Sequence, residues 1–362
     1  MTSMRTFKLG TALVALLTIA VSGGSARAEF QERLSFEGRE LIVHNLIGEI
    51  KVKGGGDSFD VLVNVQGRDG TPENIEVLAD DGGTGKLTIR YPKGQSRYVY
   101  PRLGAHSSTS FSIDDGDQGW LSSLIGALTN KRIRISGSGS GMEVWADVTI
   151  NVPSGKSLKV YHGAGEIHAD NVNGTLYLST HSGAIHASSI DGDLTADTGS
   201  GRVDVSDIRG DLLADTGSGG VSARNCEGDS IDIDTGSGGV KVEDIIARRL
   251  RIDTGSGGVT ARRVEADSAL IDTGSGSVTL ELDRMGDGEF RIDTGSGGVK
   301  LRLPAGASAD VRADTGSGGV HLDLDEPVKI RYKDRNEIAF TVGGGAARIV
   351  IDTGSGGIRI TN

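Results

Sequence analysis

Apolar and polar residues alternate with a period of two through most of the second half of the chain. Residues 230–234 (Ser-Ile-Asp-Ile-Asp) and 240–243 (Val-Lys-Val-Glu) are typical. Successive side chains of a strand point to opposite sides, so this alternation predicts short β-strands with one buried face. The pattern therefore predicts an all-β protein.

These strands recur around one motif, Asp-Thr-Gly-Ser-Gly. Its eight copies begin at Asp197, Asp215, Asp234, Asp253, Asp272, Asp293, Asp314 and Asp352. The spacing is nearly constant except before Asp352, where the interval is twice as long and leaves room for a degenerate copy near residues 333–336. A fixed period of roughly 20 residues predicts a single-stranded parallel β-helix, or β-solenoid, in which each repeat is one coil stacked on its neighbours.

Alignment of the coils places apolar residues in three columns. The first column holds Val203, Val221, Val240, Val259, Val278, Val299, Val320 and Ile358. The second holds Val205, Ala223, Val242, Ala261, Leu280, Leu301, Leu322 and Ile360. The third holds Ala196, Ala214, Ile233, Ile252, Ile271, Ile292, Ala313 and Ile351. Each coil is therefore predicted to carry two short strands that face a shared narrow core.

The glycine-rich motif is interpreted as the corner between these strands. A reversal within so few residues favours positive φ, which glycine adopts without steric cost. The Asp, Thr and Ser side chains are expected to bond N–H groups of their own turn. Coils stacked at about 4.8 Å would align the Asp side chains as a ladder of like charges. Backbone donors, arginines such as Arg251 and Arg291, or bound cations must offset that repulsion.

The same motif, in residues 270–275 (Leu-Ile-Asp-Thr-Gly-Ser), also matches the catalytic loop of an aspartic protease. That chemistry needs two loops that face each other, so that two carboxylates share one proton. Eight copies at one short period point in parallel instead. The structural corner is therefore favoured, and we predict no catalytic residue in the motif.

Residues 1–28 are predicted to be a secretory signal. Arg5 and Lys8 precede an apolar run over residues 9–21, and Ala-Arg-Ala at 26–28 supplies small residues for cleavage. The apolar run is too short to span a bilayer, so no integral membrane segment is expected after cleavage. The protein is expected to be exported, and to be periplasmic rather than secreted or on the cell surface.

The whole chain has a net charge of −11, with 38 basic and 49 acidic residues. Removing residues 1–28 deletes three basic residues and no acidic one, which leaves a charge of −14 (35 against 49). This acidity argues against nucleic acid as a partner and against anionic membranes. Cys226 is the sole cysteine and occupies an apolar position of its coil, so a buried free thiol is expected.

The predicted organisation has three parts: the signal at 1–28, an N-terminal β region or cap at 29–153, and the repetitive solenoid at 154–362. A flexible Ser- and Gly-rich segment at about 95–141 is inserted in the cap, with one helix expected from Trp120 to Leu128. Two interpretations of the insertion stay open. It is a helix packed on the cap, or a loop that contacts a partner or membrane through Trp120, Leu121, Leu124, Ile125 and Leu128.

The segment 45–52 (Asn-Leu-Ile-Gly-Glu-Ile-Lys-Val), the strand 148–153 and the serial Gly-x-Val turns carry a family resemblance. With these features the chain resembles the bacterial putative-adhesin family of β-strand-repeat proteins, a domain of unknown function. The resemblance covers most of residues 35–362 and leaves out the insertion. It implies a β-solenoid at the cell envelope, an adhesive role and no catalytic residues.

Two groups of residues suggest a metal site. His168, His186 and Asp204 follow one another at one coil period, so outward imidazoles stacked on successive coils could hold Zn or Cu, with Asp204 as a third ligand. The Asp ladder offers oxygen ligands suited to calcium. A solvated polar column is favoured over both, since the column of His168 continues as Ser222, Lys241, Thr260 and Thr279. No metal-binding, cofactor-binding or catalytic residue is predicted, and no cofactor.

The favoured function is a non-enzymatic envelope solenoid, adhesin-like or a scaffold, which presents a repetitive binding surface to an envelope protein or glycan. One alternative is a periplasmic accessory or stress-related protein that binds a single partner through residues 95–141. The other is a polysaccharide-active β-helix enzyme with carboxylates on its outer face. The ligand, the handedness of the solenoid and the oligomeric state stay open at the level of sequence.

Overall fold

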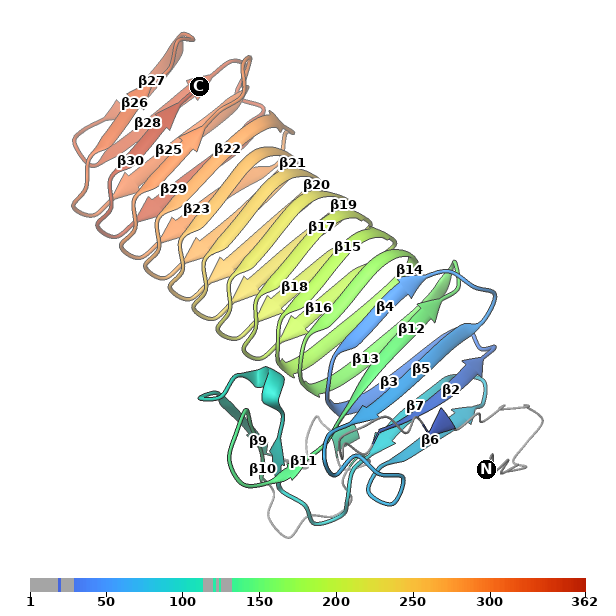
Figure 1. Ribbon diagram of the computed structural model, residues 1–362. Coiled ribbons are helices and arrows are strands. Elements are labelled where there is room, and N and C mark those ends of the chain that lie inside the picture. Colours follow the sequence, from blue (N-terminus) through green and yellow to red (C-terminus); the bar gives the residue numbers. More distant parts are fainter. Residues whose placement is uncertain (1–18, 21–28, 113–119, 122–123, 125–131) are drawn as a thin grey trace. The chain divides into compact units, whose positions relative to one another are not determined.

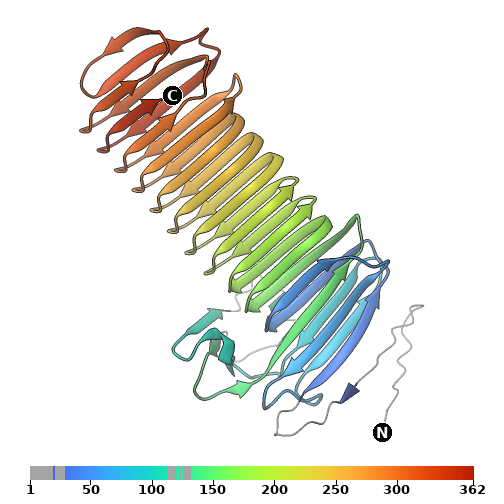
Figure 2. The same cartoon turned by 45° about the horizontal axis from the view of Figure 1, so that its top comes forward.

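The computed structural model is built almost wholly of β-strands (Figure 1, Figure 2). It describes residues 19–20, 29–112, 120–121, 124 and 132–362. The predicted signal at 1–28 lies outside the described residues, apart from Ile19–Ala20 (β1), which pairs with β2 (Phe30–Phe36). The chain divides into two compact units, residues 1–192 and 193–362, and each is described by itself.

The second unit is a parallel β-solenoid, as predicted. Its central strands are β19 (Val221–Thr235), β20 (Val240–Thr254) and β21 (Val259–Thr273). They pair in parallel, so that each residue lies opposite the equivalent residue of the next coil. The coils before them contain β16 (Leu194–Thr198), β17 (Val203–Arg209) and β18 (Leu212–Thr216). β22 (Val278–Met285) and β23 (Glu289–Thr294) follow β21. The all-β solenoid class is therefore confirmed.

The three predicted apolar columns form the core, where nearly every member is buried. Val320 and Leu322 are only partly buried, because their strand β26 (Val320–Asp323) lies at an edge beside β30 (Ile358–Thr361). Two further columns of buried residues were not predicted from the sequence. They contain Ile208, Cys226, Ile245 and Val264 in one case and Leu212, Ile231, Leu250 and Phe290 in the other.

These two columns arise because each of these coils has a second corner, which was also not predicted from the sequence. Its central residue has left-handed φ between 50° and 57° in six coils, at Asn171, Ser189, Asp207, Asn225, Asp244 and Arg263. Here two consecutive side chains point outward, and a buried residue follows. Asn and Asp tolerate this conformation better than other non-glycine residues. Side chains link the corners of adjacent coils: Asn225 Nδ2 donates to Asp207 Oδ1 at 2.6 Å.

The motif glycines serve close packing, and the prediction that they adopt positive φ is wrong. Among the described residues the positive-φ glycines lie elsewhere, as at Gly192 and Gly210. A Cβ placed on Gly238 would lie 1.8 Å from the carbonyl oxygen of Gly219, and one on Gly257 would lie 1.8 Å from that of Gly238. No side chain fits between these backbones. Each corner therefore rests directly on the corner of the preceding coil.

The motif threonines join the stacked corners through their hydroxyl groups. Gly238 N–H donates to Thr235 Oγ1 at 3.0 Å within one corner. Thr254 Oγ1 of the next coil donates to the Gly238 carbonyl at 3.0 Å. The same two contacts recur from coil to coil, and the motif threonines are at most 1% exposed. The predicted self-capping corner is confirmed for Thr, which also bonds the neighbouring coil.

The last copy of the motif stacks out of sequence order (Figure 1). β29 (Ala347–Thr353) pairs in parallel with β23 on one side and with β25 (Ala309–Thr315) on the other. β30 lies in the same way between β24 (Val299–Arg302) and β26. The coil that ends the chain therefore occupies a slot that the chain passed over at residues 303–308.

The long interval before the last motif holds a hairpin, so the predicted degenerate coil near residues 333–336 is wrong. β27 (Val328–Lys333) and β28 (Glu337–Val342) pair antiparallel, and residues 334–336 are their turn. β28 also pairs antiparallel with β25. The hairpin covers an edge that would otherwise offer unpaired backbone groups to another chain.

In the first unit, parallel coil pairing begins at residue 40. β3 (Glu40–Ile47) pairs with β13 (Lys156–Ala164), and β4 (Ile50–Gly54) pairs with β14 (Ile167–Ser182). β15 (Ile185–Asp191) continues the stack on β14. The segment 40–54 is thus a coil equivalent to the later ones.

Antiparallel strands complete the first unit. β12 (Trp145–Val152) lies between β4, to which it is parallel, and β5 (Phe59–Gln66), to which it is antiparallel. β2 pairs antiparallel with β5. β7 (Gly85–Arg90) is parallel to β3, and β6 (Glu76–Asp81) is antiparallel to β7.

The insertion at 95–141 contributes to a small sheet of its own. β10 (Arg132–Ser136) pairs in parallel with β8 (Arg97–Val99) and antiparallel with β9 (Ser108–Ser112). β11 (Met142–Glu143) pairs with β8, and a short 3-10 helix, η1, covers Pro101–Leu103. Trp120, Leu121 and Leu124 are helical, as expected, while residues 125–128 lie outside the described ones.

Removal of one threonine hydroxyl tests the contact between corners. Thr254→Val leaves the Gly257 N–H and the Gly238 carbonyl without their shared partner, which we expect to cost about 1 to 3 kcal/mol. The urea midpoint should fall, and amide hydrogen exchange at Gly257 should accelerate. Ser256→Ala, at an exposed position of the same corner, should change neither; equal effects of both variants would contradict this account.

Truncation tests the out-of-order coil. A chain that ends at Ala346 lacks β29 and β30, which separate β23 and β24 from β25 and β26. We expect limited proteolysis to cleave the truncated chain within residues 303–346 and to leave the preceding coils intact. Removal of Asn362 alone, which leaves β29 and β30 complete, is the matched control and should protect 303–346 as in the full chain. Equal resistance of the two truncations would refute the arrangement.

Candidate functional site

The motif aspartates form one outward column in the second unit, here called the Asp column. Each Asp lies in register with the next: Asp215 pairs with Asp234, Asp234 with Asp253 and Asp253 with Asp272. Asp352 lies between Asp293 and Asp314. Because these carboxylates repeat along one direction, they are not placed as two loops that face each other across a shared proton.

Within the described part of the chain, some carboxylates of the Asp column are neutralised by arginines and others are not. Burial, followed by the charges of neighbouring carboxylates, raises the pKa of Asp215, Asp234 and Asp272 above its ordinary value. Arg251 bonds Asp253 at 2.8 Å and Asp232 at 3.1 Å. Arg291 bonds Asp293 at 3.1 Å. The predicted role of the two arginines is therefore confirmed.

A second outward column lies beside the first apolar column. This Ser/Thr/Lys column contains Ser222, Lys241, Thr260, Thr279 and Lys300, in register from coil to coil. Two positions further along each strand, acids and bases alternate and pair. Arg224 lies 3.9 Å from Glu243, and Arg262 lies 3.7 Å from Glu281. The Ser/Thr/Lys column is thus bordered by side chains that neutralise one another.

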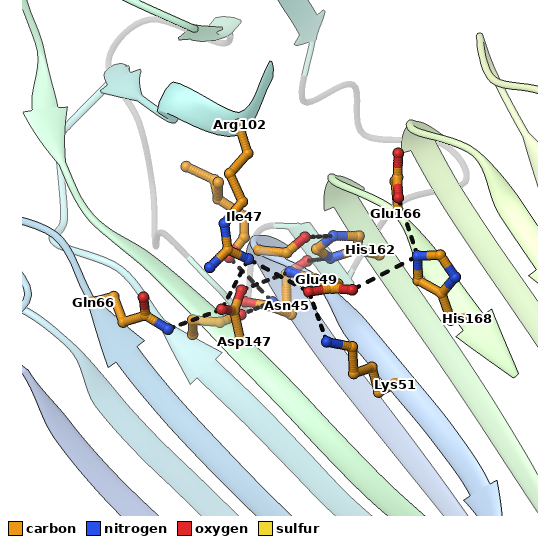
Figure 3. Close-up of polar contacts among 12 residues, drawn as sticks. Asn45, Ile47, Glu49, Lys51, Gln66, Arg102, Asp147, His162, Glu166 and His168 are labelled. Atoms are coloured by element: carbon orange, nitrogen blue, oxygen red, sulfur yellow. Dashed lines mark hydrogen bonds and ion pairs between the residues drawn. The ribbon is translucent and has the colours of Figure 1, made fainter. Parts of the chain in front are cut away.

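The first unit contains a polar cluster around the turn between β3 and β4 (Figure 3). The Glu49 N–H donates to Asp147 Oδ1 at 2.9 Å, and Gln66 Nε2 donates to Asp147 Oδ2 at 2.9 Å. Arg102, from η1, lies 3.0 Å from Asp147 and 3.5 Å from Glu49. Lys51 adds a contact of 3.1 Å with Glu49. The charges of this cluster are therefore balanced within it.

Buried polar groups hold that turn in place. Tyr91 donates its hydroxyl to the Ile47 carbonyl at 3.0 Å, and Asn45 Nδ2 donates to the Ala146 carbonyl at 2.8 Å. The ring nitrogens of His162 lie 3.2 Å from the Asn45 carbonyl and 2.9 Å from that of Gly48. Burial lowers the pKa of His162 to about 4, so the ring is neutral at physiological pH. Asn45 and Gly48, from the segment that carried the family resemblance, thus fix the position of Glu49.

The predicted stack of His168 and His186 is present. Their ring centroids lie 5.0 Å apart with an angle of 15° between the planes. His168 Nε2 is 3.0 Å from Glu166 and 3.7 Å from Glu49. Asp204, the third ligand of the metal hypothesis, belongs to the second unit. In the part of the chain that the structure describes, no group of three or more His, Cys, Asp or Glu residues is placed to hold a metal ion.

The insertion is attached to the first unit through rings as well as through Arg102. Trp120 lies 5.8 Å from His44 and 6.0 Å from Tyr161, measured between ring centroids. Leu121 and Leu124 are buried, and the Leu124 carbonyl accepts from Tyr91 N–H at 2.8 Å. The helical residues therefore pack on the unit, and these two leucines offer no exposed apolar surface. Ile125 and Leu128 lie outside the described residues.

Cys226 is a buried free thiol, as predicted. Its side chain is 1% exposed and lies between Ile208 and Ile245 of the neighbouring coils. Burial raises the pKa of the thiol to about 11, so the reactive thiolate is scarce at physiological pH.

The sequence model described as Toastrack DUF4097 matches residues 146–361. No curated protein matches the sequence. A putative cell adhesion protein from Clostridium sporogenes ATCC 15579 is 12% identical, with a TM-score of 0.23, over 92% of this chain and 99% of its own. A putative adhesin from Bacteroides fragilis NCTC 9343 is 14% identical, with a TM-score of 0.30. The match covers 92% of this chain and 96% of the adhesin. Likenesses this distant carry no argument about function.

A membrane-spanning helix would need a long apolar run, and none of the helical residues that the structure describes belongs to one.

Neutralising one member of the Asp column tests its electrostatics. Asp215→Asn removes a carboxylate whose pKa the fold raises, so we expect a higher urea midpoint at pH 7, with a gain in the free energy of unfolding of less than about 1 kcal/mol for an exposed group. The gain should shrink as pH falls through the raised pKa of Asp215 in the folded protein, and it should vanish below the ordinary Asp value of 3.8, where the carboxyl is protonated in both states. High salt should shrink it too. Asp253→Asn, which breaks the bond with Arg251, is the matched control and should lower the midpoint at pH 7.

Proposed function

The chain belongs to the Toastrack DUF4097 family, and we propose that it is a non-enzymatic, adhesin-like β-solenoid of the cell envelope. Its binding surface is the Ser/Thr/Lys column and the glycine corners beside it. The observation that supports this proposal is the register of that column, in which Ser222, Lys241, Thr260 and Thr279 recur once per coil. A ligand with its own repeat can contact several coils at once.

The chemistry of the column suits weak repeated contacts. Its members are short hydroxyl side chains or lysines, and Lys241 and Lys300 form no ion pair within the described ranges. The adjoining Arg and Glu side chains pair with each other instead. Each coil thus offers hydroxyl groups or one ammonium group to a ligand. Identical weak contacts on one rigid support add to a high total affinity.

The Asp column supports the non-enzymatic part of the proposal. Its carboxylates lie in register along one strand face, and Arg251 and Arg291 neutralise two of them, Asp253 and Asp293. Acid–base hydrolysis of a polysaccharide would instead use two carboxylates on either side of the scissile bond. The polysaccharide-enzyme alternative therefore gains no support from this column.

The location follows from the predicted signal at 1–28. Cleavage after this segment would release an acidic chain with a charge of −14 (35 basic against 49 acidic residues). We place the protein in the periplasm rather than outside the cell. An envelope protein or glycan is the partner that suits this location, and nucleic acid is not.

The alternative function, binding of one partner through residues 95–141, has its own support. The insertion builds a sheet with an exposed polar face, and Arg102 and Trp120 attach it to the first unit. Such a sheet is a defined surface for a partner. The two functions use different residues and are separable by mutation.

Matched variants of residues 29–362 test the proposed surface. Arrays of envelope glycans and immobilised envelope proteins identify a ligand of the wild-type protein. Thr260→Glu with Thr279→Glu places two charges in the Ser/Thr/Lys column, and we expect at least a tenfold loss of affinity for that ligand. Leu270→Glu with Val350→Glu adds the same charge to outward positions beside the Asp column and should bind like wild type. Equal losses in both variants, or no ligand on any array, would refute the proposal.

A further inference from the structure

One face of the insertion's small sheet collects three arginines and four serines. Arg134 of β10 lies in register with Arg97 of β8 and with Ser110 of β9. Arg132 lies opposite Ser112. Ser96 and Ser108 complete the same face, here called the arginine face. Alternate residues of a strand point to the same side, so the three guanidinium groups share one surface.

These arginines differ from most others in the protein. Most other arginines of the described residues pair with acids, as in Arg248 with Asp229 at 2.8 Å or Arg263 with Asp244. Arg97, Arg132 and Arg134 are exposed and have no carboxylate partner in the described part of the chain. In a chain with a net charge of −11, a group of arginines that the described residues leave without a carboxylate partner is a local site for anions.

The arginine face is also shaped to receive a ligand. It lines an open depression of about 630 Å³ whose lining residues are all Arg or Ser. Arg132 donates to Ser110 Oγ at 2.9 Å, which holds its guanidinium group over the sheet. The other serine hydroxyls can donate to or accept from a ligand.

The polar residues that line the arginine face favour one class of anionic ligand over the others. A membrane surface requires apolar side chains that enter the lipid, and Leu121 and Leu124 of the insertion are buried. Single-stranded nucleic acid requires rings on which bases stack, and the lining contains none in the described residues. Guanidinium groups bind carboxylates through two parallel hydrogen bonds, and hydroxyl groups match those of sugars.

We infer that the arginine face binds an acidic polysaccharide that carries uronate carboxylates. Arg132 and Arg134 are next-but-one neighbours on one strand, about 7 Å between Cα atoms. Arg97 lies on the adjacent strand, so the face can hold more than one carboxylate of the same polymer. This inference gives a chemical class to the partner of residues 95–141. It rests on that alternative function and does not depend on the Ser/Thr/Lys column.

Binding of polygalacturonate to residues 29–362 tests the inference by isothermal calorimetry at low and at physiological salt. Arg97→Gln, Arg132→Gln and Arg134→Gln together should weaken binding at least tenfold. The control carries Arg33→Gln, Arg39→Gln and Arg209→Gln, which remove the same charge from other exposed positions. It should stay within about twofold of wild type, because distant charges are screened. Circular dichroism and thermal unfolding confirm that both triple variants fold.

Each remaining outcome has a defined meaning. Absence of polygalacturonate binding, equal losses in both triple variants, or binding to phosphatidylglycerol vesicles in preference to the polymer would overturn the inference. The double variant Thr260→Glu with Thr279→Glu should bind polygalacturonate like wild type, which keeps this site distinct from the Ser/Thr/Lys column. A protein captured through the arginine face without polymer binding would refute the polysaccharide and leave the alternative function standing.

Discussion

The second unit depends on one contact, the threonine hydroxyl that joins each corner to the corner before it. Thr254 Oγ1 accepts from Gly257 N–H in its own turn and donates to the Gly238 carbonyl of the adjacent turn. Both bonds are made in a buried site, where an unsatisfied partner is costly. The contact requires backbones so close that a Cβ on Gly257 would lie 1.8 Å from that carbonyl. Thr and Gly are therefore fixed by the stacking, whereas Asp points outward and can be neutralised in different ways.

The sequence was sufficient for the period, the three apolar columns and the stack of His168 on His186, because period-two alternation and equal spacing report registers directly. It misassigned the role of the motif glycines, since sequence does not distinguish a glycine needed for φ from one needed for close approach. The left-handed corner was legible in principle: Asp207, Asn225 and Asp244 recur once per coil where the alternation breaks. The balanced cluster of Glu49, Asp147 and Arg102 could not be predicted from the sequence, because its members come from segments that are far apart in the chain.

The order of the last coils was beyond prediction for a physical reason. Coils that share the same apolar columns and the same corner offer nearly equivalent surfaces to a neighbour. Asp352 can stack on Asp293 as well as Asp314 could, so repeat similarity alone does not rank the two orders. What differs is the hairpin of β27 and β28, which pairs antiparallel with β25 and so excludes a further parallel coil at that edge. The end coil then fills the slot between β23 and β25.

The first unit also contains a strand that lies out of sequence order, and this explains why the chain at 95–141 leaves the main sheet. β12 arrives late in the sequence yet lies between β4 and β5, which both come much earlier. The chain between β7 and β12 must therefore leave the sheet and return, and this excursion contains the small sheet of β8 to β11. Arg102 on the excursion pairs with Asp147 on β12 itself. This ion pair therefore joins β12 to the segment that carries Arg97, Arg132 and Arg134.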